Sequence, residues 1–251
     1  MKVNFIIAGT QKGGTTALAQ FLSSHPQVCM APQKEVHFFD EDRKFLGPNG
    51  KPNYARYHEF FPNYAGQPAV GEATPIYMYL PFVGDRIKAY NGEMRLILIL
   101  RDPAKRAYSH YRMELERGYE RLSFRMALLL EPLRLLKKDL SSAKSPLRTH
   151  SYLDRGRYAK QLRNLETCFA REQMLILRNE DLNTQHEATM KRVYEFLGID
   201  KIVPPPAEKV FAQTYPPMDR SDRAFAIKRL EPDIRDLESL LGWDLQEWRT
   251  G

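Results

Sequence analysis

A glycine-rich loop close to the first residue has the residue types and spacing of an anion-binding site. It reads GTQKGGTT over residues 9–16, between an apolar run typical of a buried strand and a stretch with helical spacing. Glycine lets the backbone turn sharply and approach a ligand closely. Backbone N–H groups at the start of the following helix point at a bound anion, and the helix dipole favours its charge. The loop therefore predicts a phosphate-type site.

The position of the lysine indicates which atoms of the anion this loop would contact. In the Walker A pattern, GxxxxGK[ST], Gly9, Gly14 and Thr16 fit, but Thr15 occupies the place of the lysine. The lysine is Lys12, inside the loop. A Walker lysine reaches the β- and γ-phosphates of a nucleoside triphosphate, whereas a lysine placed earlier can contact a bridging oxygen beside the first phosphate. A glycine-rich turn with an incidental lysine is the alternative, and the strand–loop–helix context argues against it.

A second candidate for chemistry is a carboxylate and an imidazole two residues apart. Glu35 and His37 lie in the segment PQKEVHFFD, residues 32–40, after a short apolar run. Aromatic neighbours would exclude water, and desolvation raises the pKa of a carboxyl group, which makes Glu35 a better general base near neutral pH. The residues alone leave open an ordinary strand edge with alternating polar side chains.

Apolar runs and helical spacing alternate along the chain. We expect strands at 3–8, 28–30, 69–71, 95–100 and 174–177, and helices at 15–23, 103–116, 123–130, 158–169, 187–197 and 234–241. Two further segments, 40–66 and 137–151, are expected to be irregular. The alternation predicts an α/β fold with a central parallel sheet flanked by helices. No break in composition marks a boundary, so we expect one domain over residues 1–251.

The strand predicted at 95–100 ends next to a helix that presents a hydroxyl on the same side. Asp102 and Pro103 are typical of a helix start. Positions 102, 105, 106 and 109 share one helix face, so Ser109 can look back toward Arg101 at the strand end. Ligands of open parallel sheets bind at such carboxyl ends. A helix-capping salt bridge with Asp102 is the alternative role for Arg101.

Composition places the chain among soluble globular proteins. Of its 251 residues, 43% are hydrophobic and 27% are charged, which excludes wholesale disorder and fibrous repeats. The net charge of +7 favours an anionic partner but does not choose among nucleic acid, phosphorylated cofactors, acidic glycans and membrane surfaces. The two cysteines form no metal or disulfide pattern. Because no apolar run is long enough for stable membrane insertion and no signal peptide is recognisable, we expect a cytoplasmic protein.

Together, these segments resemble those of sulfotransferases that use 3′-phosphoadenosine 5′-phosphosulfate (PAPS). The resemblance covers most of the chain and is closest to the heparan sulfate N- and 3-O-sulfotransferase branch and its soluble bacterial relatives. QKGGTT resembles the family's 5′-phosphosulfate loop, and KEVHFFD resembles the segment with the catalytic glutamate. GEATP resembles its E-K-S-P segment, and LILRDPAKRAYSHY resembles its 3′-phosphate segment. GRYAKQL, QMLILRNEDL and VYEFLGI match the C-terminal half.

The resemblance implies a P-loop-like core and transfer of the sulfuryl group of PAPS to an acceptor hydroxyl or amine, which leaves 3′-phosphoadenosine 5′-phosphate (PAP). It implies that Lys12 stabilises the leaving group, that Glu35 deprotonates the acceptor and that His37 lines the acceptor site. It implies no metal. The donor would be bound by the glycine-rich loop and the 3′-phosphate segment through Lys12, Gly13, Gly14, Thr15, Thr16, Arg101 and Ser109.

The resemblance also implies the class of partner. The acceptor is expected to be a glycan or a small molecule and not a nucleic acid, with a sugar hydroxyl first and a lipid or other small alcohol second. Two other functions remain open. One is a P-loop small-molecule kinase, which would need a Walker lysine and a carboxylate for Mg²⁺; the other is a non-catalytic module that binds PAP or a polyanion. The acceptor's identity and the oligomeric state do not follow from the sequence.

Two features depart from the heparan sulfate branch. Ala73 stands where the E-K-S-P segment has its lysine, so that cation is missing or supplied by another residue. The family's lysine-glycine-arginine loop, which closes over the donor, is not recognisable, and the matching region 212–218 reads AQTYPPM. Arg220 and Arg223 are candidates to replace it, against the simpler interpretation of solvated surface residues. Tyr158 lies either near the adenine or in the core.

Overall fold

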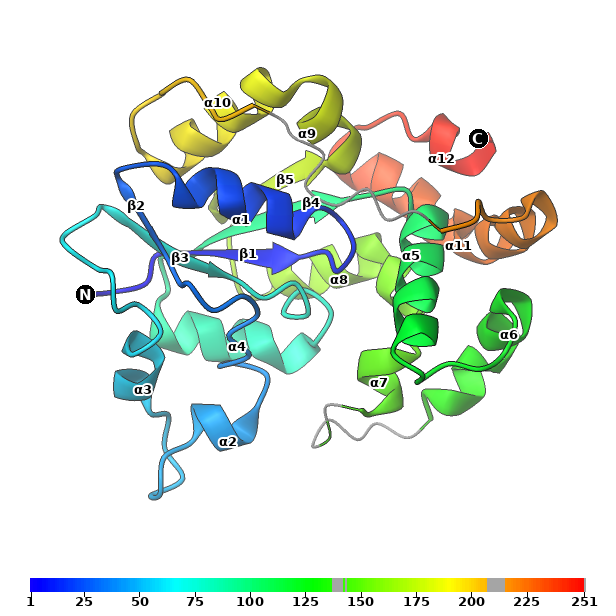
Figure 1. Cartoon of the computed structure of the whole chain (residues 1–251), viewed down its shortest axis with the longest axis horizontal. Helices are drawn as coiled ribbons and strands as arrows, with labels where there is room; N and C mark the ends of the chain where they lie inside the picture. Colours follow the sequence, from blue (N-terminus) through cyan, green and yellow to red (C-terminus); the bar gives the residue numbers. More distant parts are fainter. Residues whose placement is uncertain (137–141, 143, 207–214, 251) are drawn as a thin grey trace. The chain divides into compact units, whose positions relative to one another are not determined.

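The computed structural model describes residues 1–136, 142, 144–206 and 215–250. The chain forms two compact units. The first comprises Met1–Leu100 and Asn164–Ala212, and the second comprises Arg101–Arg163 and Gln213–Gly251. The first unit contains the sheet, and the second is built of helices (Figure 1). Within the described ranges, no helix has both the length and the apolar character needed to cross a bilayer.

Five parallel strands form one sheet in the order β2-β3-β1-β4-β5. The strands are β1 (Phe5–Gly9), β2 (Val28–Met30), β3 (Ala69–Ala73), β4 (Arg95–Leu100) and β5 (Met174–Arg178). All five were expected from their apolar runs, although β1 begins two residues later than predicted and β3 ends two residues later. The predicted α/β fold with a central parallel sheet flanked by helices is confirmed.

The strand order creates a natural ligand position at one edge of this sheet. β1 lies in the middle, with β3 on one side and β4 on the other. The chain leaves β1 toward β2 and leaves β4 toward β5, which lie at opposite ends of the sheet. The carboxyl ends of β1 and β4 therefore form a topological switch point, where ligands of open parallel sheets bind.

Helices cover both faces of the sheet in the first unit. α1 (Thr15–Ser23), α9 (Asn179–Thr184) and α10 (His186–Leu197) lie on one face, and α4 (Pro81–Tyr90) lies on the other (Figure 1). Buried apolar side chains of the first three helices and of alternate strand positions form one core cluster, which includes Phe5, Ile7, Leu18, Leu22, Ile97, Ile99, Met190 and Val193. Because both faces are covered, β4 is apolar along almost its whole length. α4 and α9 had no clear periodic pattern and were not predicted.

The excursion between β2 and β3 is more ordered than its turn-rich sequence predicted. It contains α2 (Asp42–Phe45) and α3 (Tyr54–His58). Phe45 is 6% exposed and Tyr57 is fully buried. Tyr57 stacks on Phe38 with the ring centroids 4.6 Å apart. The expectation of an irregular surface segment holds for most of residues 40–66, but packing among aromatic rings also orders two short helices that the sequence did not predict.

The second unit consists of helices, and an aspartate side chain caps the start of two of them. Its elements are α5 (Pro103–Glu116), α6 (Phe124–Arg134), α7 (Pro146–Thr149), the 3-10 turn η1 (Asp154–Gly156), α11 (Arg220–Leu241) and α12 (Gln246–Thr250). α8 (Tyr158–Glu166) begins in this unit and ends in the first, which also holds η2 (Arg171–Gln173). α11 starts well before the predicted residue 234, because Asp219 caps it by accepting from the N–H groups of Ser221 and Asp222. α7 lies inside the predicted loop 137–151, of which residues 137–141 and 143 are outside the described residues.

Candidate active site

The glycine-rich loop of residues 9–16, the candidate phosphate loop, follows β1 and turns tightly against the end of β4. The N–H of Thr10 donates to the carbonyl of Ile99 (3.1 Å), and the N–H of Gly13 donates to the carbonyl of Thr10 (2.8 Å). A Cβ at Gly13 would lie only 2.5 Å from the Ile99 carbonyl oxygen, so a side chain does not fit there. The predicted strand–loop–helix arrangement of residues 9–16 is confirmed, and the loop lies at the switch point of the sheet.

The start of α1 is left without a side-chain cap. Gly14 occupies the N-cap position with φ +103°, a conformation that favours glycine. No side chain caps this end, and its first turn holds no acidic residue. The first N–H groups of a helix, here those of Thr15 and Thr16 among them, have no partner within the helix. Together with the helix dipole, they make this end of α1 suited to an anion.

Asn179, the first residue of α9, fixes the orientation of this loop and was not predicted. Its Nδ2 donates to the carbonyl of Gly13 at 2.8 Å. A Cβ at Gly14 would lie 2.6 Å from the same nitrogen. Because a trans peptide points its carbonyl and its N–H in opposite directions, the bond to Gly13 turns the Gly14 N–H away from Asn179. The two segments are 166 residues apart, so no local pattern could indicate this contact.

The three residues predicted to be catalytic share an unusual backbone conformation. The φ angles are +68° at Lys12, +57° at Glu35 and +54° at His37, and no other non-glycine residue in the described part of the chain has a positive φ. This left-handed conformation is costly for a residue with a side chain, and such strain concentrates at functional sites. The backbone therefore singles out the same three positions as the residue types did.

Glu35 and the phosphate loop follow the ends of neighbouring strands. The N–H of Glu35 donates to the carbonyl of Ala73 (3.1 Å), the last residue of β3. Ala73 in turn pairs with Ile7 of β1. Glu35 therefore lies at the same carboxyl edge of the sheet as the loop that follows β1. Ala73 is also the position at which the E-K-S-P segment would carry a lysine.

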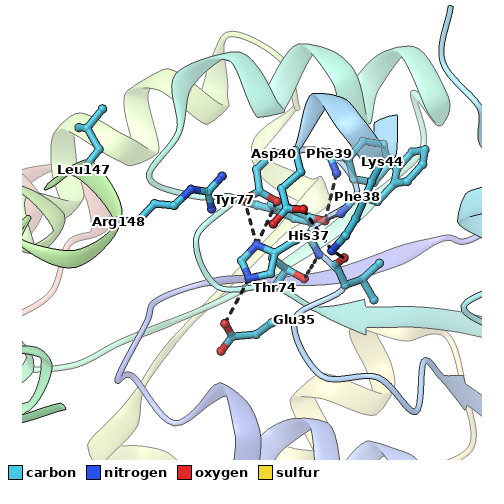
Figure 2. A network of polar contacts seen from close by, with 12 residues as sticks. Glu35, His37, Phe38, Phe39, Asp40, Lys44, Thr74, Tyr77, Leu147 and Arg148 are labelled. Atoms are coloured by element: carbon cyan, nitrogen blue, oxygen red, sulfur yellow. Dashed lines mark hydrogen bonds and ion pairs between the residues drawn. The ribbon is translucent and has the colours of Figure 1, made fainter. Parts of the chain in front are cut away.

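The imidazole of His37 lies between two carboxylates (Figure 2). Its Nδ1 is 2.9 Å from Oδ2 of Asp40, and its Nε2 is 3.5 Å from Oε2 of Glu35. The Asp40 side chain has no exposed surface, whereas 34% of the Glu35 side chain is exposed. The order Glu35–His37–Asp40 thus runs from the accessible side into the protein. Asp40 was not predicted as a partner of His37, although an acidic residue three positions further along the chain could have indicated the contact.

The charges in this chain of groups differ from the sequence-based expectation. Burial lowers the pKa of His37, but the hydrogen bonds to Asp40 and Glu35 outweigh it and raise the pKa to about 9. Burial raises the pKa of Glu35, but the hydrogen bond to His37 and the charges of Lys34 and His37 outweigh it, so the net shift is downward. The expectation that desolvation gives Glu35 a raised pKa was therefore wrong. The positive charges of Lys34 and His37, which lie in the same segment, decide the direction of the shift.

Lys34 provides a further positive charge beside Glu35. Its Nζ lies 3.5 Å from Oε1 of Glu35, while half of the Lys34 side chain remains exposed. The two carboxylate oxygens of Glu35 thus face different cations, His37 on one side and Lys34 on the other. At Ala73 the E-K-S-P segment of the family has a lysine, so this chain lacks an ammonium group at that position. Lys34 therefore brings an ammonium group next to Glu35 from another position of the chain.

A second buried carboxyl group lies in β3. Glu72 is fully buried, and burial raises its pKa to about 7, with the charge of Asp40 adding to the rise. Hydrogen bonds from Thr74 and Tyr77 act in the opposite direction. Oγ1 of Thr74 is 2.5 Å from Oε2 of Glu72. Glu72 is the glutamate of the GEATP segment, which resembles the E-K-S-P segment of the family, and no role was predicted for it.

Arg101 and Ser109, the residues expected at the 3′-phosphate, belong to the second unit. Arg101 follows directly after β4, and its carbonyl accepts a hydrogen bond of 2.9 Å from the hydroxyl of Tyr158. Tyr158 is 1% exposed, which favours the core position over a place beside an adenine. Ser109 is 2% exposed on α5. The buried Tyr158 therefore anchors the backbone of Arg101 and leaves its guanidinium group to other contacts.

Arg223, one candidate to replace the missing donor-closing loop, is engaged within the second unit. Its Nη1 lies 2.9 Å from Oδ2 of Asp102, and only 14% of its side chain is exposed. Asp102 also caps α5, as predicted. The interpretation of Arg223 as a solvated surface residue was therefore wrong. Arg220 is exposed at the start of α11, and residues 212–214 of the AQTYPPM region lie outside the described residues.

A parallel α/β sheet with a glycine-rich anion loop at its switch point is the architecture of enzymes that bind phosphorylated nucleotides. The family model described as the sulfotransferase domain matches residues 2–231. The chain belongs to the sulfotransferase family, as the resemblance had indicated.

Two of the curated relatives are heparan sulfate sulfotransferases. Heparan sulfate glucosamine 3-O-sulfotransferase 3B1 of Mus musculus is 32% identical over 206 residues, which are 79% of this chain and 46% of that protein. Bifunctional heparan sulfate N-deacetylase/N-sulfotransferase 2 of Homo sapiens is 31% identical over 202 residues, 78% of this chain and 22% of that protein. The chain thus spans less than half the length of these relatives.

A solved structure matches the whole chain. The crystal structure of a sulfotransferase from Alicyclobacillus acidocaldarius superposes with a TM-score of 0.82 at 28% identity, and the match covers 100% of both chains. The sulfotransferase domain of a Synechococcus olefin synthase has a TM-score of 0.57 at 16% identity, a likeness of fold alone. The P-loop-like sulfotransferase fold expected from the sequence is therefore confirmed.

Proposed function

We propose that this protein transfers the sulfuryl group of PAPS to a hydroxyl or amine of a glycan or small-molecule acceptor, without a metal. The observation that carries the proposal is the left-handed backbone at Lys12, Glu35 and His37. Membership of the sulfotransferase family supports it. The proposed donor loop and the proposed base lie at the ends of adjacent parallel strands.

The donor's 5′-phosphosulfate would bind at the start of α1. The N–H groups of Gly14, Thr15 and Thr16 provide donors for its oxygens, and Asn179 orients the first of these peptides. Gly13, whose own N–H donates to the Thr10 carbonyl, would let the backbone approach the ligand closely. Lys12 would contact the bridging oxygen between phosphorus and sulfur. Negative charge develops on that oxygen as the sulfur–oxygen bond breaks, so a fixed ammonium group there stabilises the transition state more than the ground state.

The acceptor would be activated by Glu35. A carboxylate oxygen of Glu35 takes the proton of the acceptor, and the acceptor oxygen or nitrogen forms a bond to sulfur. The bond from sulfur to the bridging oxygen breaks, and PAP leaves with the electron pair. As in phosphoryl transfer, alignment and charge stabilisation would provide most of the rate. The lowered pKa of Glu35 keeps it ionised at neutral pH, and therefore ready to accept the proton.

His37 would act as a cation that lines the acceptor site. With its pKa raised to about 9, it is protonated at neutral pH and cannot serve as the first base. Its Nε2 orients Glu35, and its charge favours the carboxylate form of that residue. The geometry thus supports Glu35 as base and His37 as the group that positions it.

The 3′-phosphate of the donor would be bound by Arg101 and Ser109. The guanidinium group forms charge-assisted hydrogen bonds with phosphate, often in pairs, and the hydroxyl can add one more. A sugar hydroxyl is the first acceptor class to test, with an amine, a lipid or another small alcohol as alternatives. The named activities of the relatives include both O- and N-sulfotransfer, which supports testing hydroxyls and amines together.

The test is a turnover assay with labelled PAPS and a panel of sugar, lipid and small-alcohol acceptors. PAP release is followed by chromatography, and the labelled product is identified by mass spectrometry. We expect PAP to form only with an acceptor of the right class. A folded protein that binds PAP but never forms it from PAPS would be a non-catalytic module, and phosphate transfer from ATP would indicate a kinase; either outcome contradicts the proposal.

A further inference from the structure

Glu72 is an ionisable residue in the centre of the sheet. It lies in β3, where it pairs with Ile6 of β1, and its surface is fully buried. Every residue of β3 is buried. Burying a carboxyl group without partners is costly, so a residue of this kind requires hydrogen bonds that compensate for the lost water.

Three hydroxyl groups supply those hydrogen bonds. Oγ1 of Thr74 donates to Oε2 of Glu72 at 2.5 Å, and the hydroxyl of Tyr57 donates to Oε1 at 3.4 Å. The Tyr77 hydroxyl acts on the same group, because hydrogen bonding from it lowers the pKa of the Glu72 carboxyl. Each hydroxyl has one proton and two lone pairs. When its proton is directed at Glu72, its lone pairs are left to accept hydrogen bonds from elsewhere.

Those lone pairs accept from the backbone of the catalytic segment. The Tyr77 hydroxyl oxygen accepts from the N–H of Phe38 (2.9 Å) and from that of Phe39 (3.2 Å). Oγ1 of Thr74 accepts from the N–H of His37 at 3.5 Å. Figure 2 shows Thr74 and Tyr77 beside the segment that carries Glu35 and His37. Three consecutive backbone N–H groups thus depend on two hydroxyls that both act on one carboxyl group, that of Thr74 by a direct hydrogen bond.

This arrangement lies where the backbone is most strained. Glu35 and His37 have left-handed φ angles, and such conformations persist only where the surroundings over-determine them. We infer that Glu72 is a positioning residue for the reaction, which through Thr74 and Tyr77 keeps the segment 35–39 in the conformation that presents Glu35 and His37. The effect of Glu72 on catalysis rests on the proposed function.

Tyr57 and Tyr77 offer a matched pair of variants for the test. Both side chains are fully buried and both hydroxyls act on Glu72. Within the described part of the chain, the Tyr57 hydroxyl forms no hydrogen bond with residues 35–39, whereas that of Tyr77 accepts two N–H groups from them. The substitutions Tyr57→Phe and Tyr77→Phe each remove one hydroxyl and leave the ring. A purely structural role for the cluster predicts similar effects of the two substitutions.

We expect Tyr77→Phe to lower kcat by about tenfold or more, because a catalytic group moved by even 1 Å is costly, while the affinity for PAP stays unchanged. Tyr57→Phe should keep the wild-type kcat. Glu72→Gln, which retains an acceptor oxygen, should keep more activity than the apolar Glu72→Leu. Hydrogen exchange of the Phe38 and Phe39 amides should accelerate in Tyr77→Phe and in Glu72→Leu, but not in Tyr57→Phe.

Equal effects of the two tyrosine substitutions on kcat and on amide exchange would overturn the inference, as would unchanged exchange in Glu72→Leu. Amide exchange requires no turnover, so it tests the inference separately from the proposed function. If the wild type formed no PAP from PAPS, the proposed function would fail while the exchange comparison still decided the role of Glu72 in ordering the segment.

Discussion

Nδ1 of His37 lies 2.9 Å from Oδ2 of Asp40, a carboxylate whose side chain has no exposed surface. Charge-assisted hydrogen bonds of this kind are shorter and stronger than neutral ones. The bond fixes the orientation of the ring, so Nε2 faces Glu35. Asp40 therefore acts on Glu35 through His37, because it stabilises the positive charge that lowers the pKa of Glu35.

The first prediction concerns this pair. We expect Asp40→Asn to lower the pKa of His37 from about 9, because the variant loses the charge that stabilises the imidazolium. An imidazole titration followed by NMR measures the shift. Glu41→Gln is the control, since Glu41 forms ion pairs with Arg43 and Lys44. An unchanged pKa of His37 in Asp40→Asn would contradict the assignment.

The same pair predicts a pH dependence of stability. The pKa of His37 is raised in the folded protein from 6.5 to about 9, so its contribution to stability is complete below pH 6.5 and is lost as the pH rises through about 9. Thermal unfolding between these pH values should show a decrease in Tm for the wild type that is smaller in Asp40→Asn. Parallel curves for the two proteins would refute this prediction.

We expect Lys12→Ala to lower turnover by about two orders of magnitude or more, a typical loss when one contact to developing charge is removed. The reason is the left-handed position of Lys12 inside the phosphate loop. The rate of PAP formation measures the loss. Lys51→Ala, in an exposed turn, is the matched control and should leave turnover unchanged. Near-normal turnover in folded Lys12→Ala would remove Lys12 from the mechanism.

Glu35→Gln should preserve PAP affinity and lower kcat by about a hundredfold or more, because the side chain keeps its size and loses its basic carboxylate. Calorimetric titration with PAP and the rate of acceptor sulfation measure the two quantities. His37→Ala should be partly impaired, since it removes the group that orients Glu35. An inactive His37→Ala beside an active Glu35→Gln would reverse the two roles.

Lys34→Ala should shift the acidic limb of the pH–rate profile to higher pH. Lys34 and His37 together lower the pKa of Glu35, so removing one charge raises that pKa, and the base then becomes protonated at a higher pH. Lys34→Arg retains the charge and should keep the wild-type profile. If the acidic limb of Lys34→Ala stays in place, Glu35 is not the group that the profile reports.

PAP should bind much more tightly than 5′-AMP, because the two nucleotides differ by the 3′-phosphate that Arg101 and Ser109 are proposed to bind. Two or three hydrogen bonds to a charged group, at roughly 1.5–3 kcal/mol each, give a preference of about a hundredfold or more. The preference should shrink in Arg101→Ala and weaken less in Ser109→Ala, as measured by calorimetric titration. Equal affinities in the wild type would mean that the site is not built for PAPS.

The sequence by itself determined the helices and strands that are specified by patterns within a few neighbouring residues. The bounds of β4 and of α1 and α5 agree with the expected ranges 95–100, 15–23 and 103–116. A continuous apolar run, helical spacing and an Asp-Pro start each act within a few residues. The glycine-rich loop and the candidate residues Lys12, Glu35 and His37 could be proposed for the same reason, because glycine spacing and residue type are read within short segments.

Only the tertiary structure decided how these residues are held and charged. Asn179 reaches Gly13 across 166 positions, and Tyr77 reaches Phe38 across 39. No periodic pattern records such contacts, and the aromatic packing that orders α2 and α3 is equally non-local. The pKa of Glu35 is the balance of burial against nearby positive charge, and its direction depends on distances that exist only after folding. Residue types could therefore propose a base, but the fold alone set the charge and the strained backbone of Glu35.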